Sequence, residues 1–160
     1  MKHALFTFLT LFLFTGCSIQ PHVATENAKV VTVTGQSQKQ IYNKARQWFS
    51  TYFVSGESVV DYEDASAGTI IGKGIGTAGV EALGLIKAGI HYTIRVDTKS
   101  GRMRVTTTII KHTNDDGKSV YDVAHVTPAR VAKAEAKMAS VVASLENYVN
   151  GRTGSASSNW

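Results

Sequence analysis

The sequence is poor in the residues that most often brace a small fold or carry out its chemistry. It has one Cys and two Pro among 160 residues. A single cysteine forms neither an intramolecular disulfide nor a multi-thiolate metal site, so neither can stabilise the fold. The chain also contains no G-x-S-x-G nucleophile elbow and no H-E-x-x-H spacing. It therefore lacks the familiar signatures of serine hydrolases and zinc proteases.

The overall composition is that of a globular domain. Hydrophobic residues make up 43% of the chain and charged residues 18%. This is too apolar for a disordered chain and too mixed for a protein with many membrane spans. The length suits one domain of ordinary size. The formal net charge of +5 is not concentrated in a basic tail of the kind that binds nucleic acid.

The N-terminus has the pattern of an export signal. Lys2 and His3 give a short basic start, and a predominantly apolar run of eleven residues follows over residues 4–14. As a helix this run is about 16 Å long, whereas the hydrocarbon core of a bilayer is about 30 Å thick. It is too short to span a membrane but has the length of a secretory signal, with the small residue Gly16 directly before Cys17.

The segment around Cys17 resembles the lipobox of bacterial lipoproteins. That resemblance implies that the Cys17 thiol carries a diacylglycerol and that the membrane is a partner of the chain through this lipid. Ser18 stands where lipoproteins kept in the inner membrane often have Asp, which points to the outer membrane of the cell envelope. Phe14 departs from the usual Leu. The alternatives are a conventional signal peptide with a chance cysteine and a buried N-terminal helix.

Changes in composition along the chain predict four segments. The region before residue 29 has no sustained periodicity and includes Pro21, and the region after residue 150 is rich in Gly and Ser. We therefore expect a lipoprotein signal peptide over 1–16, a lipidated tether over 17–28, a single α+β domain over 29–150 and a flexible C-terminal tail over 151–160.

Two helices are predicted within this domain. Ser37 and Gln40 have the spacing of a capping box, and apolar residues then recur every three or four positions to Phe53. The second helix begins with Thr127 as its N-cap and Pro128 in the first turn, and it ends at Asn150. The aromatic face of the first helix is expected to pack in the core.

The rest of the domain has the alternation of β-strands. β-branched runs and turn signals predict strands over 29–34, 59–63, 68–75, 90–97, 102–112 and 119–126. The expected fold class is α+β, with an antiparallel sheet of about five to six strands and two helices packed on one face, in the order β-α-β-β-β-β-β-α.

Several short motifs resemble a bacterial domain family of unknown function with a TATA-binding-protein-like fold. They lie at residues 41–49, 61–64, 68–74, 92–94 and 101–104. The resemblance covers roughly residues 30–149 and implies that fold and a secreted, often lipid-anchored setting, but no activity. The chain departs from the family pattern over 77–89, which is more apolar than expected and predicts a short helix.

Gly74, Gly76 and Gly79 match the G-x-G-x-x-G dinucleotide fingerprint, with Asp97 following at a suitable distance. The export signal and the absence of further βα units argue against nucleotide binding. Glycines that let a strand bend are the simpler interpretation. We therefore predict no cofactor.

Metal-binding and catalytic patterns are weak. The histidines are scattered, so we predict no metal site, although His112 lies near Asp115 and Asp116. Asp61 and Glu63, with their neighbour Asp64, are the carboxylates available for glycosidic chemistry, but acids in an exposed hairpin usually serve solubility. The protein is expected not to be an enzyme.

The exposed face of the sheet is the best candidate for a binding surface. Alternation along two adjacent strands places cations and hydroxyls together there, and this ligand-facing set comprises His91, Thr93, Arg95, Arg104, Thr106 and Thr108. Such a set can meet an anionic envelope component, such as lipopolysaccharide phosphate, or an acidic envelope protein. An ordinary solvated face is the alternative. The lipid anchor argues against nucleic acid as a partner. The sequence thus predicts a lipid-anchored, non-catalytic binding or structural module, with an exported hydrolase as the alternative.

Overall fold

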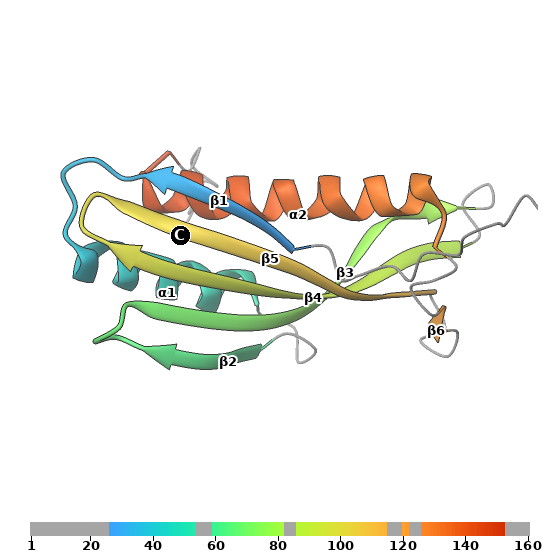
Figure 1. The fold of residues 1–160 in the computed structure, drawn as a ribbon, viewed down its shortest axis with the longest axis horizontal. Coiled ribbons are helices and arrows are strands. Elements are labelled where there is room, and N and C mark those ends of the chain that lie inside the picture. The colour runs from blue at the N-terminus through green and yellow to red at the C-terminus, as the bar shows by residue number, and fades with distance from the viewer. Residues whose placement is uncertain (1–25, 54–58, 82–85, 115–119, 122–125, 153–160) are drawn as a thin grey trace, which may run out of the picture.

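The computed structural model describes residues 26–53, 59–81, 86–114, 120–121 and 126–152. These residues form six strands and two helices (Figure 1). In chain order the elements are β1 (Glu26–Thr32), α1 (Gln38–Tyr52), β2 (Val59–Asp64), β3 (Thr69–Glu81), β4 (Ile86–Lys99), β5 (Arg102–Thr113), β6 (Val120–Tyr121) and α2 (Pro128–Val149).

The strands form one antiparallel sheet in the order β1-β5-β4-β3-β2, and the short strand β6 pairs with β5. Strands β2 to β5 pair in sequence order as hairpins. β1, the first strand of the chain, instead pairs with β5, which is distant from it in the sequence. The predicted α+β class and antiparallel sheet are confirmed.

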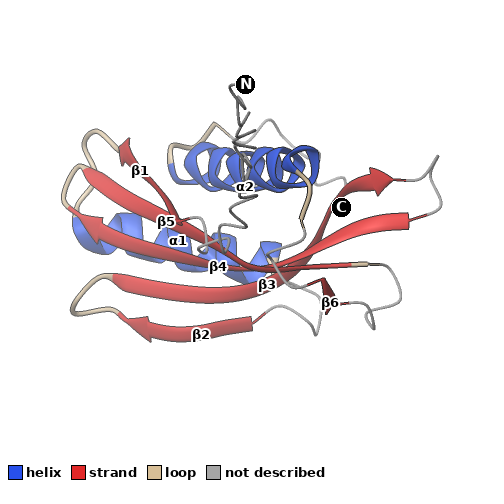
Figure 2. Ribbon diagram, turned by 45° about the vertical axis from the view of Figure 1, so that its right-hand side comes forward, coloured by secondary structure: helices blue, strands red, loops and turns tan. Residues whose placement is uncertain are grey.

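Both helices lie on the same side of the sheet, behind it in the view of Figure 1, and Figure 2 shows the two helices and the sheet from a second direction. Local signals begin each helix where the sequence predicts. The Ser37 hydroxyl accepts from the Gln40 amide, and the Gln40 side chain accepts from the Ser37 amide in return. At the start of α2 the Thr127 hydroxyl accepts from the Arg130 amide, and Pro128 lies in the first turn.

The core lies between the helices and the sheet. Ile41 and Phe49 of α1 and Leu145 of α2 are fully buried against strand residues such as Ile94. Trp48 stacks on Tyr52 with ring centroids 4.5 Å apart, and its indole nitrogen donates to the Ser144 hydroxyl at 3.1 Å. This hydrogen bond joins the two helices. Burial of the aromatic face is the main source of stability for α1.

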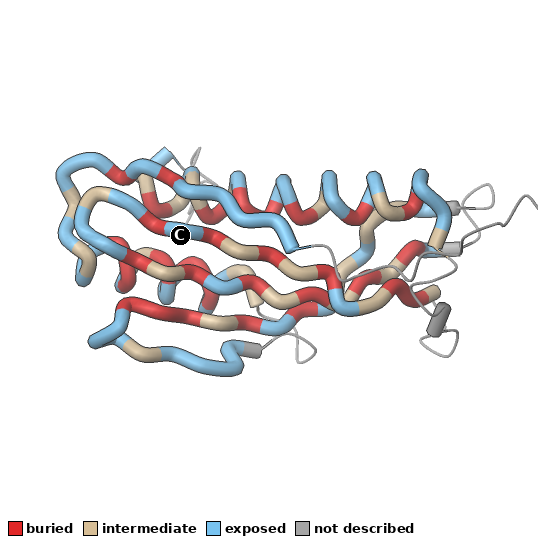
Figure 3. Tube along the Cα trace, in the orientation of Figure 1, coloured by how far each residue is buried: buried red, intermediate tan, exposed pale blue. Residues whose placement is uncertain are grey.

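Burial alternates along the central strands, as Figure 3 shows. Tyr92, Ile94 and Val96 of β4 are buried, and the residues between them are half-buried or exposed. Met103, Val105, Thr107 and Ile109 of β5 follow the same pattern. One face of the sheet therefore packs against the helices, and the other has no helix over it among the described residues.

The short helix considered for residues 77–89 is absent from the described part of that segment, residues 77–81 and 86–89, which is strand. β3 continues to Glu81 and β4 begins at Ile86, and the two remain paired from Thr77 opposite Gly89 to Glu81 opposite Ile86. A partner strand that continues alongside satisfies these backbone groups, so pairing overrides the local apolar pattern. The G-x-G-x-x-G residues consequently lie inside one continuous strand, not at the strand-to-helix turn that a dinucleotide fingerprint requires.

Other strand boundaries differ less. β1 spans 26–32 rather than 29–34, and β4 and β5 extend beyond their predicted ends. Of the strand predicted over 119–126, the described residues include the pair Val120–Tyr121 in β6, while 119 and 122–125 lie outside them. Among the described helices, neither has the length and apolarity that crossing a membrane requires.

Candidate functional site

We call the sheet surface opposite the helices the open face. Register places the predicted residues together on it: Thr93 lies opposite Thr108, and Arg95 lies opposite Thr106. Arg104 lies one pair further along, opposite Asp97. His91 belongs to the same face by alternation and is half-buried. The structure thus brings together the six residues that the alternation predicted.

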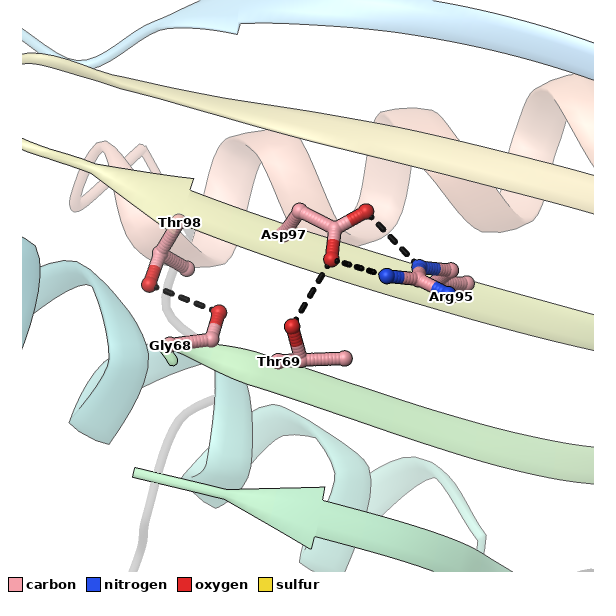
Figure 4. Close-up of polar contacts among 5 residues, drawn as sticks. All are labelled: Gly68, Thr69, Arg95, Asp97 and Thr98. Atoms are coloured by element: carbon pink, nitrogen blue, oxygen red, sulfur yellow. Dashed lines mark hydrogen bonds and ion pairs between the residues drawn. The ribbon is translucent and has the colours of Figure 1, made fainter. Parts of the chain in front are cut away.

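Asp97 is a member of this face that the sequence reasoning did not include. Its carboxylate accepts from the Arg95 Nε at 2.8 Å and from the Arg95 Nη2 at 2.9 Å, and the Thr69 hydroxyl donates to it at 2.8 Å (Figure 4). The same alternation that selected Arg95 also selects a residue two positions later, so the signal was present in the sequence.

This contact changes the charge available on the face. Hydrogen bonding by Arg95 holds the pKa of Asp97 below its usual range, and the hydrogen bond from Thr69 and the positive charge of Arg104 act in the same direction. Asp97 is therefore ionised near neutral pH. Arg95 is held in a two-bond pair and is fixed in position, with its own charge balanced.

A turn closes one end of the open face. The Thr98 hydroxyl donates to the Gly68 carbonyl at 2.9 Å, and the Thr98 amide donates to the same oxygen at 2.8 Å (Figure 4). Gly68 has a φ of +71°, a conformation that favours glycine. These contacts fix the β2–β3 turn beside the end of β4.

A pocket of about 410 Å³ lies at this end of the open face, and we call it the hairpin pocket. Four elements contribute to it: β1, the β2–β3 turn, and the ends of β4 and β5. Its lining residues are Val30, Ala67, Arg95, Asp97, Thr98, Lys99, Arg102, Met103 and Arg104. Four of these are cationic and one is acidic, so the pocket has a formal net charge of +3.

Arg102 and Lys99 were not among the predicted site residues. They flank the Ser100–Gly101 turn and lie opposite each other in the β4–β5 register. Val30, which is 60% exposed, lies opposite Arg104 on β1 and gives the pocket an apolar wall. The contribution of Val30 depends on pairing between β1 and β5, which local sequence patterns do not encode.

The carboxylates considered for glycosidic chemistry have separate partners. Asp61 pairs with Lys73 at 2.9 Å, and Glu63 pairs with Arg46 of α1 at 2.8 Å. Asp64 accepts from the backbone amides of residues 66 and 67, and these bonds to the β2–β3 turn lower its pKa. Each acid thus stabilises a different piece of local structure.

The remaining candidates lie elsewhere or outside the described residues. His112 is fully buried at the end of β5, and Asp115 and Asp116 are outside the described residues. Within the described ranges, no group of three or more His, Cys, Asp or Glu residues has the arrangement to hold a metal ion. Cys17 also lies outside the described part of the chain.

Comparison with known sequences identifies a family. Residues 28–113 match the family described as a domain of unknown function (DUF4468) with a TBP-like fold. Among curated proteins, no sequence is detectably similar to the chain.

Two solved structures resemble the whole fold. A DUF4468 family protein from Bacteroides ovatus has a TM-score of 0.62 at 22% identity, over 87% of this chain and 92% of that one. A TBP-like protein from Parabacteroides distasonis has a TM-score of 0.59 at 16% identity, over 78% of this chain and 94% of that one. At these identities the likeness shows a shared fold.

Proposed function

The chain belongs to the DUF4468 family of domains with a TBP-like fold, and on this premise we propose that it is a lipid-anchored envelope protein. Its open face recognises an anionic envelope partner, and it does so without catalysis. The observation that carries the proposal is that the described helices cover only one of the two faces of the sheet. Both helices cover one face of the sheet, and the other face presents cations among hydroxyls.

The distribution of charge on the open face supports an anionic partner. Arg95 is balanced by Asp97 and Lys73 by Asp61. Among the described residues, Lys99, Arg102 and Arg104 have no side-chain ion pair. Guanidinium groups present several N–H donors in a fixed plane, which suits carboxylate and phosphate partners.

Anchoring at Cys17 supports an envelope location, most consistent with the outer membrane because of Ser18. Only eight residues separate Cys17 from the start of β1 at Glu26. At about 3.3–3.6 Å per extended residue, this segment reaches about 30 Å. The lipid therefore keeps the domain close to the bilayer surface. Attachment through two or more acyl chains is stable, whereas a single chain binds a membrane only weakly and reversibly.

Anchoring is tested by labelling cells that express the full chain with radioactive palmitate. We expect the wild-type chain to take up the label and Cys17→Ala to lose it. A wild-type chain without label, or a Cys17→Ala chain that retains it, would contradict the anchor.

Recognition by the open face is tested with two charge reversals that change the net charge of the protein by the same amount. Arg104→Glu changes the open face, and Arg46→Glu changes the helical layer. The probe is a heparin column run with the full chain in maltoside detergent. We expect Arg104→Glu to elute at a lower salt concentration than Arg46→Glu, because the contacts are local. Equal elution would show that net charge alone governs retention and would remove the open face from the account.

The absence of catalysis is tested separately with esterase, peptidase and glycosidase substrates. We expect no turnover by the purified chain above the background hydrolysis of each substrate. Turnover that persists through purification would favour an exported hydrolase instead.

A further inference from the structure

The hairpin pocket contains an unfavourable arrangement of like charges. Lys99 and Arg102 lie directly opposite each other across the β4–β5 hairpin. Like charges in this arrangement destabilise a sheet. The described residues provide no carboxylate ion pair for either side chain. An anion between them would relieve the repulsion, and this points to a ligand rather than to a purely structural role.

A third cation adds to the same pocket. Arg104 is on the same face as Arg102, two residues along β5, and lies opposite Asp97. Asp97 is already bonded to Arg95 through the Nε and Nη2 atoms of that residue. The carboxylate thus holds Arg95 at the edge of the pocket through two of its three guanidinium nitrogens. The excess of three positive charges calls for a ligand with more than one negative charge.

The size and lining of the pocket indicate which chemical group accompanies the negative charge of the ligand. Its volume of about 410 Å³ is well above the roughly 30 Å³ that a water molecule occupies in the liquid. A phosphoryl group alone leaves much of the space empty. Val30 forms an exposed apolar wall beside Arg104, so the remaining space suits the carbon skeleton of an ester.

We propose that the hairpin pocket binds a phosphate ester, with Lys99, Arg102 and Arg104 holding the phosphoryl oxygens and Val30 contacting the esterified group. This deepens the proposed function and rests on it, because it assigns a ligand class to the open face. The same chemistry is available from a soluble phosphate ester and from the headgroup of an anionic lipid.

The first experiment is an NMR titration of the isotope-labelled full chain in phosphate-free maltoside detergent. The probes are glycerol 3-phosphate, inorganic phosphate and acetate. We expect glycerol 3-phosphate to shift the backbone amides of residues 98–104 and to bind more tightly than inorganic phosphate, with acetate the weakest. Equal binding of acetate, or shifts confined to the helices, would overturn the proposal.

Two pocket variants and one matched control test the residues. Lys99→Gln and Arg102→Gln each remove one charge from the pocket, and Arg46→Gln removes one from α1. We expect each pocket variant to lower the affinity for glycerol 3-phosphate by about tenfold or more, and the control to leave it unchanged. Because the pocket variants also relieve repulsion, their unfolding temperatures should be equal to or above that of the wild type. Loss of binding together with loss of stability would indicate a folding defect and would count against the charge arrangement described here.

A second measurement identifies the source of the phosphoryl group. The full chain is reconstituted into vesicles of phosphatidylcholine alone or an equal mixture with phosphatidic acid, whose headgroup is a phosphate monoester that can carry two negative charges. Slower amide exchange over 98–104 in the mixed vesicles, abolished by Arg102→Gln, assigns the ligand to a lipid headgroup. Identical exchange in both vesicles, together with binding of glycerol 3-phosphate, assigns it to a soluble ester.

The outcomes separate this proposal from the proposed function. If the pocket variants bind glycerol 3-phosphate as well as the wild type while Arg104→Glu still elutes early from heparin, the pocket assignment is wrong and recognition by the open face stands. If Arg104→Glu and Arg46→Glu also elute together, both proposals are wrong.

Discussion

Replacing Gly68 by alanine is expected to destabilise the domain more than the same replacement at Gly35. Both glycines have positive φ, +71° at Gly68 and +75° at Gly35. Left-handed backbone at a residue with a Cβ costs about 1–2 kcal/mol, and both variants incur this cost. Their surroundings differ: an added Cβ at Gly35 meets nothing within 4 Å, whereas at Gly68 it falls 2.5 Å from the Thr98 hydroxyl oxygen and 3.0 Å from the Thr98 carbonyl oxygen.

The close contact at Gly68 cannot be relieved cheaply. The added Cβ would also meet the side chain of Gln38, which can move away. Thr98 cannot, because it is 2% exposed and bonds to the Gly68 carbonyl through both its amide and its hydroxyl. Overpacking of this kind adds about 1–3 kcal/mol. We therefore expect Gly68→Ala to lose about 2–5 kcal/mol and Gly35→Ala about 1–2 kcal/mol.

The assay is urea unfolding of the purified full chain, followed by the fluorescence of buried Trp48. Equal losses of unfolding free energy in the two variants, with an unchanged dependence of that free energy on urea concentration, would refute the steric argument. Backbone strain would then be the whole effect. A smaller loss at Gly68 than at Gly35 would contradict the geometry of the β2–β3 turn itself.

Three further predictions concern caps, helix packing and pH. Ser37→Ala removes the reciprocal cap of α1 and should cost about 1 kcal/mol, whereas Ser140→Ala, at an exposed position inside α2, should change the urea midpoint little. Trp48→Phe removes the indole hydrogen bond to Ser144 and part of the stack on Tyr52, and we expect a loss of about 1–2 kcal/mol; a neutral result would show that the two helices do not depend on this bond. The pKa of Asp97 is depressed in the folded state, so its contribution to stability is present above the unfolded value of about 3.9 and is lost as the pH falls through the lower folded pKa. Carbon NMR titration of the carboxyl groups should show Asp97 titrating below an ordinary aspartate, and Asp97→Asn should reduce the acid dependence of stability; a carboxyl that titrates normally would argue against the pair with Arg95.

The parts of the fold that were predicted correctly are those that local chemistry specifies. The cap residues Ser37 and Thr127 mark the starts of both helices, because a hydroxyl that accepts from an amide three residues later acts within one turn. The alternation in β4 and β5 gave the correct faces because side-chain direction in a strand has a period of two residues.

The parts that were missed depend on contacts between distant segments. Residues 77–81 and 86–89 are apolar and rich in small residues, so nothing local distinguishes a strand from a helix there; their pairing across β3 and β4 decides. The hairpin pocket likewise requires Val30 of β1 to lie beside Arg104 of β5. The position of Asp97 on the open face does not depend on such contacts, because the alternation along β4 alone predicts it.

The central claim is that recognition takes place on the open face and not on the helical layer. The most direct measurement places a photo-crosslinking amino acid either at Thr106 on β5 or at Ser140 on α2, in the full chain expressed in intact cells. Thr106 lies on the open face, and Ser140 is exposed on the opposite layer. The account predicts a defined adduct from position 106 that is lost when Arg104→Glu is added, with none from position 140. An adduct from position 140 alone, or equal adducts that survive Arg104→Glu, would contradict it.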